Sequence, residues 1–294
     1  MAWHQLSVIT NENLVEKVAD FFSELGAVSV TYMDAEDKPV YEPEPGEIKI
    51  WCLTKVIALF ELEIEPELVK TLLFSQLKGI DGDSWSEEII QDQAWERAWM
   101  EHYHPMKFGK SLWVCPTGQE KIEEGCVCMT LDPGLAFGTG THPTTALCLE
   151  WLANHDITDQ IVIDYGCGSG ILAVAAVLLG AKEVHAIDID PQAIIATKAN
   201  AEKNNVQEKI KYNLPEEFVA FQADIVLANI LANTLCDLAE PLSLLLKPKG
   251  NLVLSGILNE QAKSVIEAYG KVDIHIKDPV SQEDWCQLEG QKNK

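Results

Sequence analysis

The sequence predicts an α/β protein in which a larger domain with a doubly wound, mostly parallel sheet follows a smaller α+β domain. Residues 161–170 read Ile-Val-Ile-Asp-Tyr-Gly-Cys-Gly-Ser-Gly and lead into an apolar run over 171–181, the pattern of strand, tight loop and helix. From residue 112 onward, short apolar segments alternate with helical ones, which is typical of a doubly wound domain. Residues 1–92 instead follow the order β-α-β twice.

The first 92 residues show the periodicity of a small sandwich. Their order of elements predicts a split βαβ (ferredoxin-like) domain without a chemical motif of its own. A polar stretch over 34–46, which holds three prolines, interrupts it. The expected elements are strand 3–9, helix 12–25, strand 27–33, strands 48–52 and 56–64, helix 66–79 and strand 84–91.

Composition limits the classes of partner. The 294 residues are 47% hydrophobic, enough for two domains with cores of their own. The net charge is −24, and residues 1–92 contribute 19 acidic and 6 basic side chains to it. Because phosphate binding needs a basic surface, we expect no direct nucleic acid partner and favour a basic protein, with a merely solubilising acidic surface as the alternative. No run approaches the roughly 20 apolar residues that span a bilayer, and no basic leading segment precedes an apolar one, so we expect a cytoplasmic protein without membrane attachment.

No metal site is expected. The eight cysteines include no Cys-x-x-Cys pair, and the nearest approach, Cys126 and Cys128, has no partner cluster to complete four ligands. His102 and His104 stand two positions apart on an expected helix over 94–104, so they face different ways. That helix stops at Pro105 and forms a linker, which divides the chain into domains 1–92 and 110–294 with the linker at 93–109.

The glycine loop is the centre of the larger domain. Gly166, Gly168 and Gly170 permit backbone conformations closed to other residues and let a ligand approach the main chain. The free N–H groups of the helix that follows favour a negatively charged group. The third glycine comes one residue earlier than in a dinucleotide fingerprint, and Asp164 stands two residues before the first.

A second acidic residue indicates a nucleoside. Asp188 ends the strand expected over 183–187 and lies 22 residues beyond Gly166, where a βαβ unit presents a carboxylate to a ribose diol. NAD-dependent enzymes and S-adenosylmethionine-dependent methyltransferases share this spacing. A glycine-rich turn beside a solvent-facing Asp is the alternative.

Two further segments belong to the same edge of the sheet. A loop over 131–145 leads into a helix that starts at Pro143 with His142 or Thr141 at its cap; it either closes over a small ligand or is an ordinary capped loop. It lacks the Lys-Ser/Thr of a phosphate-binding P-loop. Asn229 follows the strand expected over 224–228, and its amide oxygen can accept a hydrogen bond from an amine.

The last segments complete a seven-stranded plan. Lys247-Pro-Lys-Gly250 is expected to turn a helix into a strand within 244–255, and closing strands are expected near 272–276 and 285–288.

Four segments together resemble the ribosomal protein L-eleven methyltransferase family. They are residues 132–145, 164–170, 186–191 and 229–232, and the stretch Phe-Gly-Thr-Gly-Thr-His-Pro-Thr-Thr is the most specific. The resemblance implies a Rossmann-like class I methyltransferase domain at 110–294 and a substrate-recognition domain at 1–92. It implies that S-adenosylmethionine donates methyl groups to lysine side chains and the N-terminal amine of ribosomal protein L-eleven.

The resemblance also assigns roles to residues. The cofactor contacts it implies come from Thr145, Gly166, Asp188 and Asn229, with Phe137, Asp164, Gly168 and Gly170 in the same motifs. The catalytic role expected of Asn229, orienting the neutral amine, comes from the chemistry of its amide. Its segment also resembles the Asn-Pro-Pro-Tyr motif of methyltransferases that act on amino nitrogens, although two prolines and the aromatic residue are missing.

Other functions stay open at this point. A class I methyltransferase acting on another protein, a small molecule or RNA is the main alternative. An NAD-linked oxidoreductase would share Asp188 and the glycine loop, and a binding module could keep the fold without turnover.

Overall fold

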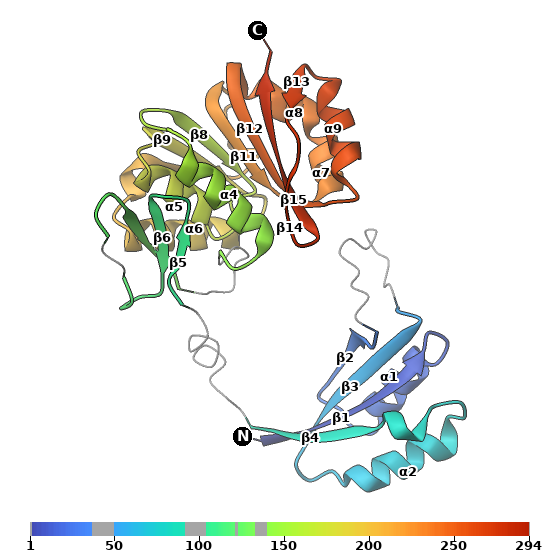
Figure 1. Ribbon diagram of the computed structural model, residues 1–294. Coiled ribbons are helices and arrows are strands. Elements are labelled where there is room, and N and C mark those ends of the chain that lie inside the picture. The colour runs from blue at the N-terminus through green and yellow to red at the C-terminus, as the bar shows by residue number, and fades with distance from the viewer. Residues whose placement is uncertain (1, 37–49, 92–103, 121–122, 133–139, 294) are drawn as a thin grey trace. The chain divides into compact units, whose positions relative to one another are not determined.

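The computed structural model describes residues 2–36, 50–91, 104–120, 123–132 and 140–293. These form two compact units, Met1–Ala98 and Trp99–Lys294 (Figure 1). Most of the expected linker helix lies outside the described residues.

The first unit is a four-stranded antiparallel sheet with two helices. The strand order is β2-β3-β1-β4. Phe22 of α1, Phe60 of β3 and Leu73 of α2 are almost fully buried together in its core. The strand expected at 48–52 is wrong in its described part, because residues 50–52 lie outside β3. The elements are β1 (Ala2–Asn11), α1 (Val15–Glu24), β2 (Ser29–Asp34), β3 (Leu53–Glu61), α2 (Pro66–Gln76), the 3-10 helix η1 (Gly82–Ser84) and β4 (Ser86–Gln91).

The second unit alternates strands and helices from β8 onward. It opens with a small sheet of three strands, β5-β6-β7. The elements of the opening are β5 (Met106–Phe108), β6 (Leu112–Cys115), β7 (Val127–Thr130) and α4 (Pro143–Asn154). The elements that follow are β8 (Ile161–Tyr165), α5 (Ile171–Leu178), β9 (Glu183–Ile187), α6 (Pro191–Lys203), η2 (Gln207–Lys209), β10 (Ile210–Asn213), β11 (Ala223–Asn229), α7 (Ala232–Asp237), α8 (Ala239–Leu244), β12 (Leu246–Leu258), α9 (Ala262–Gly270), β13 (Ile274–Ile276), β14 (Val280–Gln282) and β15 (Trp285–Lys292).

The large sheet contains parallel and antiparallel strands, and the direction in which the chain adds strands to it changes between β10 and β11. The order is β10-β9-β8-β11-β12-β15-β13, and β14 adds an eighth strand by pairing with β15. The sheet therefore has one strand more than the predicted seven, because residues 280–282 form an extra edge strand before β15. The five strands from β10 to β12 are parallel, whereas β15 runs antiparallel to β12, β13 and β14. From β8 the chain builds outward through β9 and β10, then returns to β11 on the other side. A crevice is expected at the carboxyl ends of β8 and β11, where such a reversal occurs.

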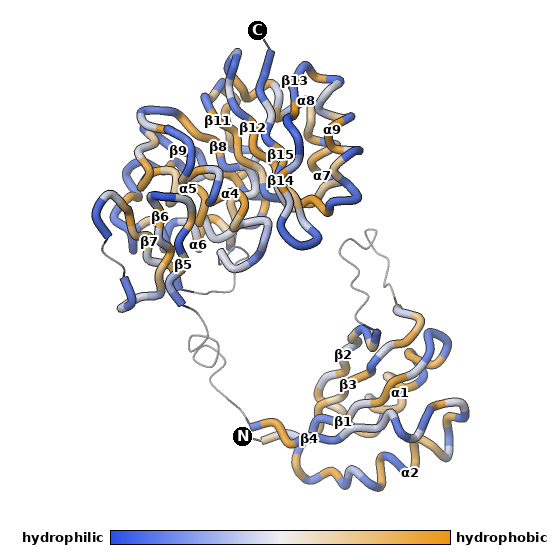
Figure 2. The backbone as a smooth tube through the Cα atoms, in the orientation of Figure 1, coloured by the Kyte–Doolittle hydropathy of each residue, from blue (hydrophilic) through white to orange (hydrophobic). Residues whose placement is uncertain are grey.

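Helices cover both faces of this sheet. The core that contains residues of α4, α5 and α6 lies on one face, and the core that contains residues of α7, α8 and α9 lies on the other (Figure 1). The central strands are strongly apolar, as Figure 2 shows, because strands covered on both faces have no solvent-facing side. Helix α5 is apolar as well, since nearly all of its residues are buried. This rigid frame fixes where the loops at the sheet edge begin.

One predicted turn is instead a bulge in a strand. Lys247–Gly250 interrupts the pairing of β12 with β11 but stays within β12, because both flanks pair with β11. The ammonium of Lys247 holds this bulge through a 2.8 Å bond to Oδ1 of Asp224 in β11.

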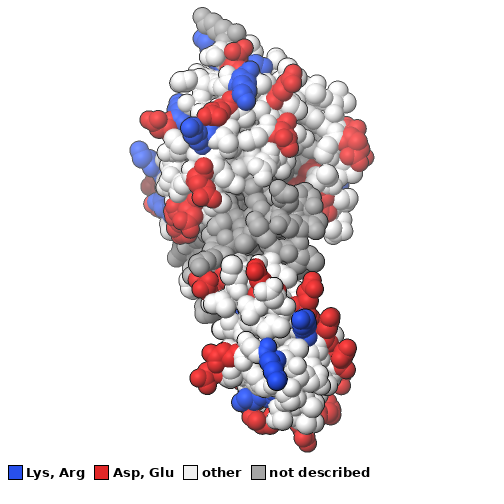
Figure 3. All heavy atoms as spheres, turned by 90° about the vertical axis from the view of Figure 1, so that its right-hand side faces the viewer, with Lys and Arg blue, Asp and Glu red and all other residues white. Residues whose placement is uncertain are grey.

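The surface is acidic, as the composition predicts. On the face shown in Figure 3, Asp and Glu side chains outnumber Lys and Arg on both units. None of the helices in the described ranges has the length and apolar character that crossing a membrane requires.

Candidate functional site

A cavity of about 580 Å³ opens at the carboxyl ends of β8, β9 and β11. Its size suits a small organic ligand or cofactor. Apolar side chains form much of the wall, with a carboxylate and an amide among them. The lining residues are Tyr165, Gly166, Gly168, Ile187, Asp188, Ile189, Pro215, Asn229, Ile230, Leu231, Thr234 and Leu238.

The glycine loop follows β8 with a backbone that requires glycine. Gly166, Gly168 and Gly170 have φ of 80°, 54° and 77°. The amide of Gly166 donates to the carbonyl of Ile187 at 2.7 Å, so the loop stays fastened to the end of β9. A Cβ on Gly166 would lie 2.3 Å from Cγ2 of Ile230. Because Gly166 has no side chain, the loop can pack directly against Ile230, the residue after Asn229.

Helix α6 holds the far side of the loop. The Thr197 hydroxyl donates to the carbonyl of Gly168 at 3.1 Å, and Nδ2 of Asn200 donates to the carbonyl of Ser169 at 2.8 Å. A Cβ on Gly170 would lie 2.5 Å from Cγ2 of Thr197. The structure thus places Gly170 against α6, and it does not line the cavity.

Asp188 joins the glycine loop to the start of α6. Its Oδ2 accepts from the amide of Gly168, and its Oδ1 accepts from the amide of Asp190, both at 2.9 Å. Asp190 in turn caps α6 by accepting from the amide of Gln192. Each carboxylate oxygen of Asp188 has a second lone pair for a ligand hydroxyl.

Asn229 ends β11 and meets the helix that begins on the second loop. Its Nδ2 donates to Oγ1 of the fully buried Thr145 at 3.3 Å. Its Oδ1 is buried and has no partner among the described residues. The predicted start of this helix is confirmed: Pro143 is the first residue of α4, and His142 caps it by accepting from the amide of Thr144. Burial lowers the pKa of His142, which keeps the ring neutral for this role.

Asp164 is fully buried beneath the loop. Its Oδ2 accepts from the amide of Ala173 in α5 at 3.1 Å, and its Oδ1 has no partner among the described residues. Burial raises the pKa of Asp164 to about 7, and the nearby charge of Asp188 acts in the same direction. The amide of Ala173 opposes the shift without cancelling it.

The structure brings four of the predicted site residues to one cavity: Gly166, Gly168, Asp188 and Asn229. Thr145 contacts Asn229 from outside the lining, and Phe137 lies outside the described residues. The sequence interpretation missed much of the apolar wall, including Ile230, Leu231 and Leu238, although two of these directly follow Asn229. No cluster of three potential metal ligands occurs in the described ranges.

Comparisons with known proteins agree on one family. The family model described as Ribosomal protein L11 methyltransferase (PrmA) matches residues 2–293. The chain is 51% identical to the ribosomal protein L11 methyltransferase of Histophilus somni over 100% of this chain and 99% of that protein. It is 49% identical to the protein of the same description from Methylococcus capsulatus, over 98% of each. It is similar to the crystal structure of ribosomal protein L11 methylase from Lactobacillus delbrueckii subsp. bulgaricus, with 31% identity, a TM-score of 0.60, and coverage of 65% of this chain and 100% of that one.

The buried carboxyl of Asp164 predicts a distinct pH dependence of stability. The unfolded chain ionises this group near its ordinary value of 3.8, whereas the folded protein keeps the proton until about pH 7. The folded state therefore binds more protons in this interval, and the stability that protonation provides is lost as pH rises through 7. The wild type should lose about 2.5 kcal/mol more than Asp164→Asn between pH 5 and pH 8, in urea unfolding at each pH. Parallel pH profiles for the two proteins would contradict the shift.

Proposed function

The chain belongs to the ribosomal protein L11 methyltransferase family, and from this membership we propose that it transfers methyl groups from S-adenosylmethionine to lysine side-chain and N-terminal amines of ribosomal protein L11. The observation that carries the proposal is the family match over residues 2–293, which includes the whole cavity wall. In this assignment the second unit is a Rossmann-like class I methyltransferase domain. Its chain reversal between β8 and β11 supports a nucleoside site there.

The residues of the cavity fit this cofactor. Gly166 has no side chain that would clash with Ile230 of the wall, and Asp188 presents acceptor oxygens suited to a ribose diol. The Oδ1 of Asn229, which has no partner among the described residues, needs a donor, because an unsatisfied buried oxygen costs about 1–3 kcal/mol. Gly168 contributes the glycine loop to the cavity wall, whereas Thr145 and Asp164 lie behind the wall and support Asn229 and the start of α5. When bound, the cofactor supplies a methyl group activated by a positively charged sulfur.

Asn229 orients the amine that attacks. Its Oδ1 accepts an N–H from the neutral amine, which directs the nitrogen lone pair toward the methyl group. The Thr145 hydroxyl fixes the amide because it accepts from Nδ2, so the oxygen is the atom left for the substrate. Correct placement of reacting groups can lower a barrier by about 7–11 kcal/mol, and we assign most of the rate to it.

Deprotonation of the amine is a separate requirement. At pH 7 it costs roughly 4.6 kcal/mol for a lysine of pKa about 10.4, and about 1 kcal/mol for an α-amine. A positive sulfur and an apolar wall both lower a lysine pKa. Water therefore suffices as proton acceptor, and Asn229 binds the neutral form.

The first unit is assigned to substrate recognition. Its strand order β2-β3-β1-β4 with two helices supports a split βαβ (ferredoxin-like) domain over residues 1–92. The linker expected over 93–109 ends earlier than that, because Met106–Phe108 form β5 in the small sheet of the second unit. The acidic excess of these residues favours a basic partner such as a ribosomal protein. The enzyme would act in the cytoplasm, without a membrane or direct nucleic acid contact.

Mass spectrometry tests this function directly. Purified ribosomal protein L11 incubated with the enzyme and S-adenosylmethionine should gain mass in steps of one methyl group, at lysines and the N-terminus. Incubation with an Asn229→Ala variant is the control for residual cofactor reactivity. An unmodified L11, with methylation of another component of a ribosomal extract, would reject this substrate.

Replacing Asn229 by Ala should lower turnover far more than cofactor affinity. Loss of the oriented amine should reduce kcat by about a hundredfold, measured by methyl transfer at saturating cofactor. Thr234→Ala, at another polar position of the same cavity wall, is the matched control and should keep kcat within about twofold. A normal kcat at saturating cofactor, together with a strongly raised Kd for the cofactor, would show that the orienting role is wrong.

Replacing Asp188 by Ala should weaken the cofactor first. The variant loses the acceptor for the ribose and the support of the Gly168 amide, so Kd should rise at least about tenfold in calorimetry. Asp188→Asn keeps the shape and one acceptor oxygen, and it should fall between Ala and wild type. Unchanged affinity in both variants would refute the ribose contact.

A further inference from the structure

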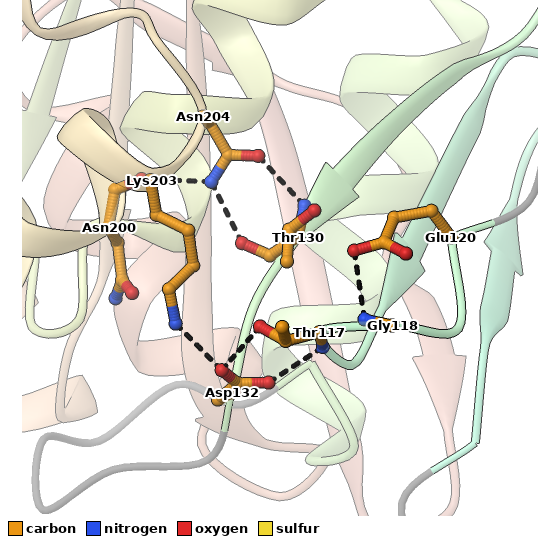
Figure 4. A network of polar contacts seen from close by, with 8 residues as sticks. All are labelled: Thr117, Gly118, Glu120, Thr130, Asp132, Asn200, Lys203 and Asn204. Atoms are coloured by element: carbon orange, nitrogen blue, oxygen red, sulfur yellow. Dashed lines mark hydrogen bonds and ion pairs between the residues drawn. The ribbon is translucent and has the colours of Figure 1, made fainter.

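A paired amide contact fastens β7 to the end of α6. The amide of Thr130 donates to Oδ1 of Asn204 at 2.7 Å, and Nδ2 of Asn204 donates back to the Thr130 carbonyl at 2.8 Å (Figure 4). The two partners are 74 residues apart in the chain. The small sheet of the second unit is therefore tied to the last turn of α6.

An ion pair lies beside this amide contact. Oδ2 of Asp132 accepts from Nζ of Lys203 at 2.7 Å and from Oγ1 of Thr117 at 2.6 Å, while Oδ1 accepts from the amide of Thr117 at 2.8 Å (Figure 4). Burial raises the pKa of Asp132, but the bonds from Lys203 and Thr117 outweigh it, so the pKa lies below its ordinary value. The carboxylate is thus charged at neutral pH, and both of its oxygens accept hydrogen bonds.

The same helix holds the glycine loop. Nδ2 of Asn204 also donates to the carbonyl of Asn200 at 2.8 Å, and Asn200 supports the carbonyl of Ser169 one turn earlier. A continuous series of hydrogen bonds therefore runs from Thr130 through α6 to the loop. The start of α6 is tied to Asp188 through the amide of Asp190. Freeing the last turn of α6 would weaken one of the supports of the loop, the bonds from α6 to the carbonyls of Gly168 and Ser169.

We propose that Lys203 and Asp132 are positioning residues of the methyltransferase site: their ion pair, beside the Asn204 contact, holds α6 where it presents the glycine loop to the cofactor. Neither residue lines the cavity, so they act through Thr197 and Asn200. The inference rests on the proposed function. When fewer free molecules hold a binding-competent loop, the apparent affinity falls by the same fraction.

Binding of S-adenosylhomocysteine to the full chain, measured by calorimetry, tests this role. Lys203→Met should raise Kd about fivefold, equivalent to about 1 kcal/mol, and Lys203→Arg, which keeps the charge and the donor, should restore Kd to within about twofold. The kcat for L11 at saturating cofactor should stay within about twofold, because the reacting groups are untouched.

A second ion pair provides the matched control. Nζ of Lys247 lies 2.8 Å from Oδ1 of Asp224, and the two side chains are 40% and 32% exposed. The side chains of Lys203 and Asp132 are exposed to a similar extent, 36% and 28%. Asp224 also accepts from a backbone amide, that of Ile161, but it lies near the start of β11, at the end of the strand opposite to Asn229. Lys247→Met should therefore lose similar stability in urea unfolding and leave Kd unchanged.

The outcomes separate the two proposals. If Lys203→Met leaves Kd unchanged, or if Lys247→Met raises it as much, the positioning role is wrong while the proposed function stands. If the wild type itself binds no S-adenosylhomocysteine, the proposed function fails, and the positioning role fails with it. A Kd raised in Lys203→Met alone and restored in Lys203→Arg supports the inference.

Discussion

The geometry of the site depends on the two hydrogen bonds that the carboxylate of Asp188 accepts from backbone amides. One oxygen holds the amide of Gly168 and the other holds the amide of Asp190, so the glycine loop and the start of α6 are fixed by one side chain. A carboxylate can do this and still receive ligand hydroxyls, because each oxygen accepts more than one hydrogen bond. The carboxylate that fixes the loop and the start of α6 therefore keeps acceptor capacity for the ligand hydroxyls proposed above.

Much of the site could be predicted because its signals are local. The glycine loop, Asp188 and Asn229 each follow directly from the strand that carries them, and the carboxyl ends of parallel strands share one edge. The spacing of the glycines alone could not tell which of them faces the cavity and which packs against a neighbouring helix. Gly166 faces Ile230 across the cavity wall, whereas Gly170 is a glycine because Thr197 of α6 packs against it.

Contacts between distant segments could not be predicted. Thr197 and Asn200 lie three residues apart on α6, and Asn204 is the residue that caps the end of this helix. Their partners are 29, 31 and 74 residues away, and nothing in the polar sequence of an exposed helix identifies them. The bulge at Lys247–Gly250 was missed for the same reason. Its sequence is typical of a turn, and only the pairing of both flanks with β11, together with the Lys247–Asp224 ion pair, keeps it within the strand.

The acidity of the chain has opposite effects outside and inside the site. A net charge of −24 attracts a basic protein, but a negative field also stabilises a protonated lysine, which cannot attack. The site counters this locally. Its wall includes Ile187, Ile230 and Leu238, and burial raises the pKa of Asp164 to about 7, so that this carboxyl is about half protonated at neutral pH. At the amine site proposed above, the apolar wall and the partly protonated Asp164 therefore oppose the effect of the acidic surface, although Asp188 still contributes a carboxylate to the same wall.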